Sequence, residues 1–170
     1  MKRIYFIWGG LLGWDGYLTS IGLRTLDSQL RQFGAVKTYM QASLNECVHD
    51  IYAECGKDDL CVLGGYSGGT IQAARAAVFL AEKRIPQDIA LLINMDGSPQ
   101  YNLNKPDTIP RSNVKNILNI YNPTANWPGG GCLKGENIPF KNYTFCINHL
   151  SFQFNQQVRD IICRAVANLK

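Results

Sequence analysis

The sequence predicts an α/β fold, a three-layer α/β/α sandwich around a mainly parallel sheet of about six strands. Three observations lead to this prediction. Short apolar runs alternate along the chain with segments of helical hydrophobic spacing. The apolar runs lack polar alternation, so helices should cover both faces of the sheet. The chain has 170 residues, 46% hydrophobic and 18% charged, which fits one domain over residues 1–170.

The first half of the chain predicts the order strand, helix, strand, helix, strand. The initial apolar run stops at Gly9-Gly10, and the two helical patterns stop at Gly34 and Gly56. Each stop is a glycine, which readily forms the turn into the next element. The expected elements are strand 2–8, helix 18–33, strand 35–40, helix 44–55 and strand 60–63.

The second half continues the alternation and contains the longest loop. A cluster of alanines between Thr70 and Lys83 suits a helix that packs closely on a sheet. The Pro/Gly/Asn-rich loop Asn122–Asn142 precedes the last strand, in which Cys146 should be a core residue, like Cys61 earlier in the chain. The expected elements are helix 70–83, strands 88–95, 114–121 and 143–148, and an amphipathic helix over 154–169.

Charge and hydropathy exclude several function classes. The net charge is only +4 and the basic residues are scattered, which argues against nucleic-acid binding and against a polybasic membrane anchor. No apolar stretch reaches the ~18 residues of a membrane span. The segment Met1–Leu12 resembles a short secretory signal, but it lacks a small-residue cleavage site and glycines interrupt it. We therefore expect a cytoplasmic protein, with export as the alternative.

The cysteine spacing gives no reason to expect a metal site. The six cysteines form no C-x-x-C pair of the kind that zinc sites use. We expect reduced thiols in a cytoplasmic protein. A disulfide bond between Cys55 and Cys61 is the alternative for an exported one.

The segment Gly65-Tyr66-Ser67-Gly68-Gly69 carries the most specific motif. It reads G-x-S-x-G and lies between a predicted strand and a predicted helix, the context in which this motif forms a nucleophile elbow. The serine backbone is strained there and the helix passes close to the strand, so its neighbours need to be glycines. A glycine-rich turn without chemistry is the alternative. A phosphate-binding loop would need a lysine that is absent.

A serine nucleophile needs a base and oxyanion donors. His149 follows the last strand and is the candidate base, with a capping or surface role as its alternative. His49 lies beside the apolar stripe of a predicted helix and should be solvated. The candidate oxyanion donors are the Gly68 N–H and an amide of Gly10 or Leu11, in the glycine-rich loop after the first strand. The alternative is that this loop is a glycine-rich turn between strand and helix without a catalytic role.

Together, these features resemble a minimal α/β-hydrolase, similar in size to cutinase-like, small esterase or thioesterase domains, over nearly the whole chain. The usual first hairpin of that fold is missing. The resemblance implies a serine hydrolase that cleaves a small-molecule ester or thioester through an acyl-enzyme on Ser67, with His149 as the base and no cofactor. The alternatives are an acyltransferase using the same acyl-enzyme and a catalytically silent scaffold used for binding. The segment 97–113 is too short for a cap domain, so the site should be open.

The resemblance leaves the triad acid open. Asp96 is the first choice, because it ends a strand on the side of the sheet where reactive groups gather. The usual acid position of the family holds Asn122, the second choice as a neutral orienter and the reason to consider a silent scaffold. Glu136, in the long loop, is third. Tyr66 and Trp127 are candidate substrate-binding residues, and the long loop is a candidate mobile wall of the site.

Overall fold

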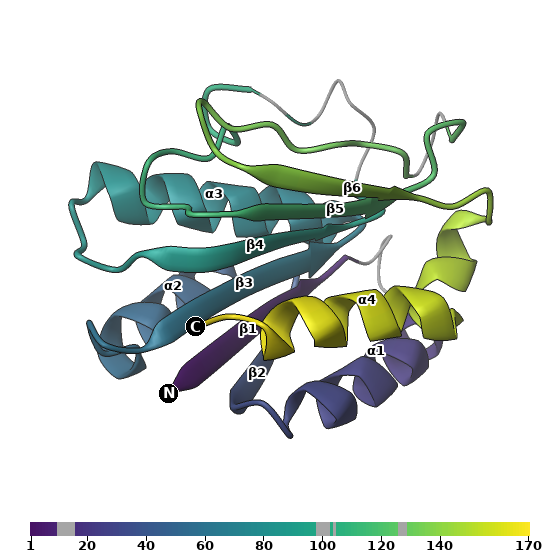
Figure 1. Ribbon diagram of the computed structural model, residues 1–170, viewed down its shortest axis with the longest axis horizontal. Helices are drawn as coiled ribbons and strands as arrows, with labels where there is room; N and C mark the ends of the chain where they lie inside the picture. Colours follow the sequence, from purple (N-terminus) through teal and green to yellow (C-terminus); the bar gives the residue numbers. More distant parts are fainter. Residues whose placement is uncertain (10–15, 98–102, 104, 126–128) are drawn as a thin grey trace.

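The computed structural model describes residues 1–9, 16–97, 103, 105–125 and 129–170. Within these residues a six-stranded sheet has the order β2-β1-β3-β4-β5-β6, and every neighbouring pair is parallel. The strands are β1 (Lys2–Trp8), β2 (Ala35–Met40), β3 (Leu60–Tyr66), β4 (Ile89–Met95), β5 (Ile117–Tyr121) and β6 (Phe140–Thr144). Helices cover both faces of the sheet (Figure 1), so the predicted α/β sandwich is confirmed.

The helices divide into two layers, and each layer has its own core. Helices α2 (Leu44–Glu54) and α3 (Gly68–Glu82) cover one face. Helices α1 (Gly16–Leu30) and α4 (Gln156–Ala167) cover the other, where Leu26 and Leu30 of α1 share a buried cluster with Val158, Ile162 and Val166 of α4. Both faces of the central strands are therefore buried, which explains why the sequence of these strands is almost continuously apolar.

Helix α3 lies close to the sheet because its inner face is small. The predicted cluster of alanines is fully buried there, and it consists of Ala73, Ala74, Ala76 and Ala77. At the start of the helix, the Thr70 hydroxyl donates a hydrogen bond of 3.0 Å to the Gly65 carbonyl. This packing holds the first turn of α3 directly against the carboxyl end of β3, where Ser67 lies.

Two asparagine caps fix the chain after β6. The Asn148 side chain accepts a hydrogen bond from the Ser151 N–H at 2.9 Å and begins the 3₁₀ helix η2 (His149–Phe154). The Asn155 side chain accepts from the Val158 N–H at 3.1 Å and begins α4. The predicted terminal helix therefore starts two residues later than the apolar spacing suggests, and His149 begins a separate short helix.

The predicted strand 143–148 is wrong in position. Strand β6 runs from Phe140 to Thr144, because its register is set by pairing with β5, and all five of its residues are exposed on this sheet edge. Beyond the strand, Phe145 and Ile147 pack against the core while the residue between them faces outward. Cys146 is consequently exposed, and our expectation that it is a core residue is also wrong, whereas Cys61 is buried as predicted.

The segment between β4 and β5 contains no helix in its described part, which has turns, bends and isolated bridges. No cap domain is therefore seen between these strands, as expected. None of the described helices is long and apolar enough to cross a membrane.

Candidate active site

Ser67 lies at a sharp turn between β3 and α3. Its backbone has φ 56° and ψ −127°, a conformation that costs a non-glycine residue energy and persists only where the surroundings enforce it. The flanking glycines show how the surroundings enforce this conformation of Ser67. A Cβ on Gly65 would collide with the Gly69 carbonyl, and a Cβ on Gly69 would collide with the Ile7 carbonyl of β1. Close approach of three backbone segments thus explains the G-x-S-x-G spacing.

Asp96 and His149, 53 residues apart in the chain, form a hydrogen bond. The His149 Nδ1 and Asp96 Oδ2 atoms are 2.6 Å apart. The Asp96 side chain is fully buried and the His149 side chain is 10% exposed. Asp96 follows β4 with a left-handed φ of 44°, and its N–H donates to the Ile120 carbonyl of β5 at 2.6 Å. The end of the sheet therefore fixes the position of the carboxylate.

The second carboxylate oxygen of Asp96 is also bonded. Its Oδ1 accepts the backbone N–H of Asn122 at 3.0 Å and that of Gly130 at 3.1 Å. Two backbone amides therefore hold this oxygen in place. The other oxygen is left for His149, which is the arrangement that holds an imidazole in one tautomer.

Tyr66 supports the imidazole from the strand that carries Ser67. The two rings stack with centroids 5.0 Å apart and planes at 15°, and the Tyr66 hydroxyl donates to the His149 carbonyl at 2.8 Å. Burial, and to a lesser degree the Asp96 carboxylate, raises the pKa of this hydroxyl, so it remains a donor. Tyr66 is only 1% exposed. Our expectation that it contacts substrate is therefore corrected: its ring is covered, and it positions His149.

The Gly68 N–H is the backbone amide directly after Ser67. Gly68 is the first residue of α3, so this N–H has no carbonyl partner within the helix. A Cβ on Gly9 would lie 2.6 Å from the Gly68 nitrogen and 2.8 Å from the Ser67 Cβ, so glycine at position 9 keeps this space open. The other expected donors, Gly10 and Leu11, lie outside the described residues.

Gln41 is a neighbour of this site that the sequence did not indicate. It follows β2, and a Cβ on Gly68 would lie 2.5 Å from the Gln41 Oε1 and 2.9 Å from its Nε2. The side-chain amide therefore rests against the first residue of α3. Only the strand order, which brings the end of β2 near the end of β3, reveals this contact.

Solved structures with a similar fold were found by structural comparison. Est1E from Butyrivibrio proteoclasticus matches with a TM-score of 0.50 and 12% identity, over 97% of this chain and 85% of that chain. A Xanthomonas campestris pv. campestris protein assigned to the alpha/beta hydrolase superfamily matches with a TM-score of 0.55 and 14% identity, over 98% and 96%. The chain has the α/β-hydrolase fold. No protein-family model and no curated protein matches the sequence.

In this α/β-hydrolase fold, the geometry separates the three candidate acids. Asp96 contacts His149, as described above. The Asn122 side chain instead donates to the Ile147 carbonyl at 3.0 Å and accepts from the Thr124 N–H at 3.0 Å, and only its backbone N–H reaches Asp96. Asn122 therefore binds Asp96 through its backbone. Its side chain does not contact the imidazole, as a neutral orienter would have to do.

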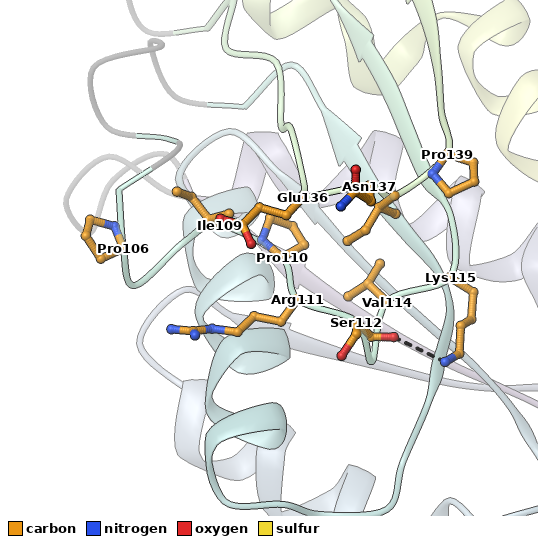
Figure 2. Close-up of a pocket in the computed structure, with 11 residues that line it drawn as sticks. Pro106, Ile109, Pro110, Arg111, Ser112, Val114, Lys115, Glu136, Asn137 and Pro139 are labelled. Carbon is orange, nitrogen blue, oxygen red and sulfur yellow. Dashed lines mark hydrogen bonds between the residues drawn. The ribbon is translucent and has the colours of Figure 1, made fainter.

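Glu136 lies at the other end of the sheet. It lines a pocket of about 800 Å³ together with Val114 and Pro139, which precede β5 and β6 (Figure 2). A five-residue strand is ~16 Å long, so this pocket is separated from the carboxyl ends of the strands by that length. Glu136 is consequently not placed to orient His149.

The described part of the long loop packs against the site. Gly129, Gly131 and Leu133 are buried, and Gly131 forms an antiparallel bridge with Gly97. That this loop is a mobile wall stays a prediction. A Cβ on Gly129 would lie 2.7 Å from the His149 Nδ1, so this glycine covers the hydrogen bond between His149 and Asp96. Trp127, the expected substrate contact, lies outside the described residues.

The remaining candidates lie apart from the site. The His49 side chain is 76% exposed on α2, as predicted, and its Nδ1 lies 3.5 Å from the Asp50 Oδ1. All six cysteines belong to the described part of the chain, and no disulfide bond joins them, including Cys55 and Cys61. Among the described residues no group of three His, Cys, Asp or Glu side chains is placed to hold a metal ion.

Proposed function

We propose that this protein is a single-domain serine hydrolase that cleaves a small-molecule carboxylic ester or thioester through an acyl-enzyme on Ser67. The observation that carries the proposal is the buried Asp96–His149 hydrogen bond at the strand ends that also carry the Ser67 elbow. A strained, partly exposed serine and an imidazole oriented by a carboxylate, both at the carboxyl ends of the strands, are the groups that a serine nucleophile and its base require. The α/β-hydrolase fold adds to the proposal by analogy.

The proposed reaction has two steps. His149 Nε2 takes the proton of Ser67 Oγ as that oxygen bonds to the substrate carbonyl carbon. The tetrahedral intermediate then collapses, and the imidazolium gives its proton to the departing alcohol or thiol. Water attacks the acyl-enzyme in the same way and releases the acid. Asp96 holds Nδ1–H throughout, and the Gly68 N–H, with that of Gly10 or Leu11, stabilises the oxyanion.

A fluorophosphonate probe tests this proposal, since it reacts covalently only with an activated serine. We expect stoichiometric labelling, with the adduct on the peptide that contains Ser67. Hydrolysis of acyl esters and thioesters of graded chain length would then define the substrate. An unlabelled folded protein would favour the silent scaffold, although the contact between Asp96 and His149 removes the reason to expect one. Product analysis with an added alcohol distinguishes acyl transfer from hydrolysis.

Replacing Asp96 with Asn tests the proposed acid. The variant keeps the shape of the side chain but presents an amide to the Nδ1, which favours the wrong tautomer of His149. We expect turnover to fall about 10⁴-fold with a normal circular dichroism spectrum, by analogy with a protease triad. Asn122→Asp is the matched comparison, because Asn122 touches Asp96 only through its backbone, and it should lose far less. Near-wild-type turnover in Asp96→Asn would contradict the assignment.

The absence of a cap between β4 and β5 in the described residues leads to a further prediction. Without helices to open, the rate should not rise when a substrate passes its micellar threshold. The measurement is initial rate against concentration for a short-chain ester on both sides of that threshold. An abrupt increase in rate at the threshold would contradict the open site.

A further inference from the structure

Three asparagines lie side by side across the sheet, immediately beneath the site. Asn94 of β4 pairs in register with Asn119 of β5, which pairs with Asn142 of β6. Asn94 and Asn119 are fully buried, while Asn142 is exposed on the edge strand. We call these three residues the asparagine ladder. Two buried amides at paired positions of adjacent apolar strands are unusual, because each buried polar group costs free energy unless it is hydrogen-bonded.

The ladder is bonded along its whole length. The Asn94 Nδ2 donates to the Asn119 Oδ1 at 2.9 Å, and the Asn119 Nδ2 donates to the Asn142 Oδ1 at 3.0 Å. The same groups also bind the backbone of the long loop. Asn94 donates to the Gly131 carbonyl at 2.8 Å. Asn119 donates to the Leu133 carbonyl at 3.0 Å and accepts the Leu133 N–H at 2.9 Å.

The loop segment held by the ladder is the one that contacts the acid. Gly131 is bonded directly to the ladder. The residue before it, Gly130, donates its N–H to Asp96. Gly129 covers the bond from Asp96 to His149. The Asn94 Oδ1 accepts the Gly97 N–H at 2.9 Å, so the ladder also ties down the residue that follows Asp96.

We propose that the asparagine ladder positions the Asp96–His149 pair, by holding residues 129–133 so that the Gly130 N–H stays on the acid. The inference rests on the proposed function of that pair. Stability alone does not explain the ladder, since replacing both partners of a buried hydrogen bond with apolar groups is often nearly neutral. Apolar side chains would, however, remove the ladder's hydrogen bonds to the Gly131 carbonyl and to the Leu133 N–H and carbonyl, and leave the segment freer to shift. The ladder residues are positioning residues, because they reach the reacting atoms only through Asp96.

Position 142 offers the sharpest test, because it is exposed and both variants should fold. Asn142→Ala removes one of the two acceptors of the Asn119 Nδ2, whereas Asn142→Asp keeps an oxygen there. We expect kcat to fall about 3- to 10-fold in the alanine variant with KM unchanged, since water replaces part of the lost bond. The downfield proton resonance of the His149 Nδ1–H should weaken in parallel. The aspartate variant should restore both. Wild-type kcat and resonance in Asn142→Ala would overturn the proposal.

Asn119→Ala removes the central residue and should have the larger effect. It leaves the Leu133 N–H unpaired and its carbonyl with only the Cys132 thiol, 3.7 Å away, and we expect kcat to fall on the order of 10²-fold. Asn113→Ala is the control for general destabilisation, because the Asn113 side chain donates to the Ala77 carbonyl of α3 and takes no part in the ladder. Equal kcat losses at 113 and 119, or at 113 and 142 if Asn119→Ala does not fold, would overturn the proposal.

The test separates this inference from the proposed function. If wild-type protein does not react with the fluorophosphonate probe, the proposed function fails before any variant is compared. If wild-type protein reacts, and the ladder variants react at the same rate, only the inference fails.

Discussion

Ser67→Ala should abolish turnover and covalent labelling while leaving the fold intact. The change removes one oxygen from a partly exposed turn, and alanine tolerates the φ of 56° no worse than serine does. Loss of the nucleophile in comparable enzymes lowers turnover about 10⁶-fold. Steady-state kinetics on an activated acyl ester, with mass spectrometry after fluorophosphonate treatment, measures the effect. The melting temperature should change by only a few degrees.

Ser112→Ala is the matched control for that variant. Ser112 is also an exposed serine, but it lines the pocket at the amino ends of the strands. Its loss should change neither labelling nor turnover. Substantial residual turnover in Ser67→Ala, or equal losses at both serines, would contradict the assignment of the nucleophile.

His149→Ala should lower turnover to a similar extent, because Ser67 then has no base. The variant also leaves the buried Asp96 carboxylate without its imidazole partner and removes the stacked ring from Tyr66. We therefore expect a loss of stability of about 1–3 kcal/mol as well, measurable by urea unfolding. The double variant with Ser67→Ala should be no slower than either single variant, since the two residues act as one unit.

His49→Ala provides the comparison, because these are the only two histidines in the chain. His49 is solvated on α2, so its replacement should leave turnover unchanged and alter the free energy of unfolding by less than about 0.5 kcal/mol. Comparable losses of turnover from the two histidine variants would show that the base has been assigned wrongly.

Local patterns were sufficient for the sandwich and for the serine elbow. Apolar runs of strand length, and apolar residues at helical spacing, depend only on residues close together in the sequence. They can be seen without knowing which strands pair in the sheet. The glycines at 65 and 69 are likewise informative, because the collision that excludes a side chain follows from a local turn between a strand and a helix. His149 was found by the same means, as the histidine that follows the last strand.

The position of β6 shows where local patterns fail. The apolar residues Phe145 and Ile147 suggest a strand that the structure does not form there, because an edge strand is placed by its hydrogen bonds to β5 and not by burial. That register is a relation between residues 117–121 and 140–144. Cys146 was misplaced for the same reason.

The choice of Asp96 as the proposed acid rests only on the tertiary structure. Asp96, Asn122 and Glu136 all lie between the serine and the histidine in the chain, and each carries a side chain able to accept a hydrogen bond. The choice depends on which of them the left-handed turn after β4, the neighbouring end of β5 and the segment 129–133 bring to the His149 Nδ1. Sequence by itself thus determined the fold class and indicated the proposed serine and histidine, which depend on short-range spacing. The acid, the covered Tyr66 ring and the asparagine ladder depend on hydrogen bonds between strands that are distant in the chain, and those exist only once the sheet has assembled.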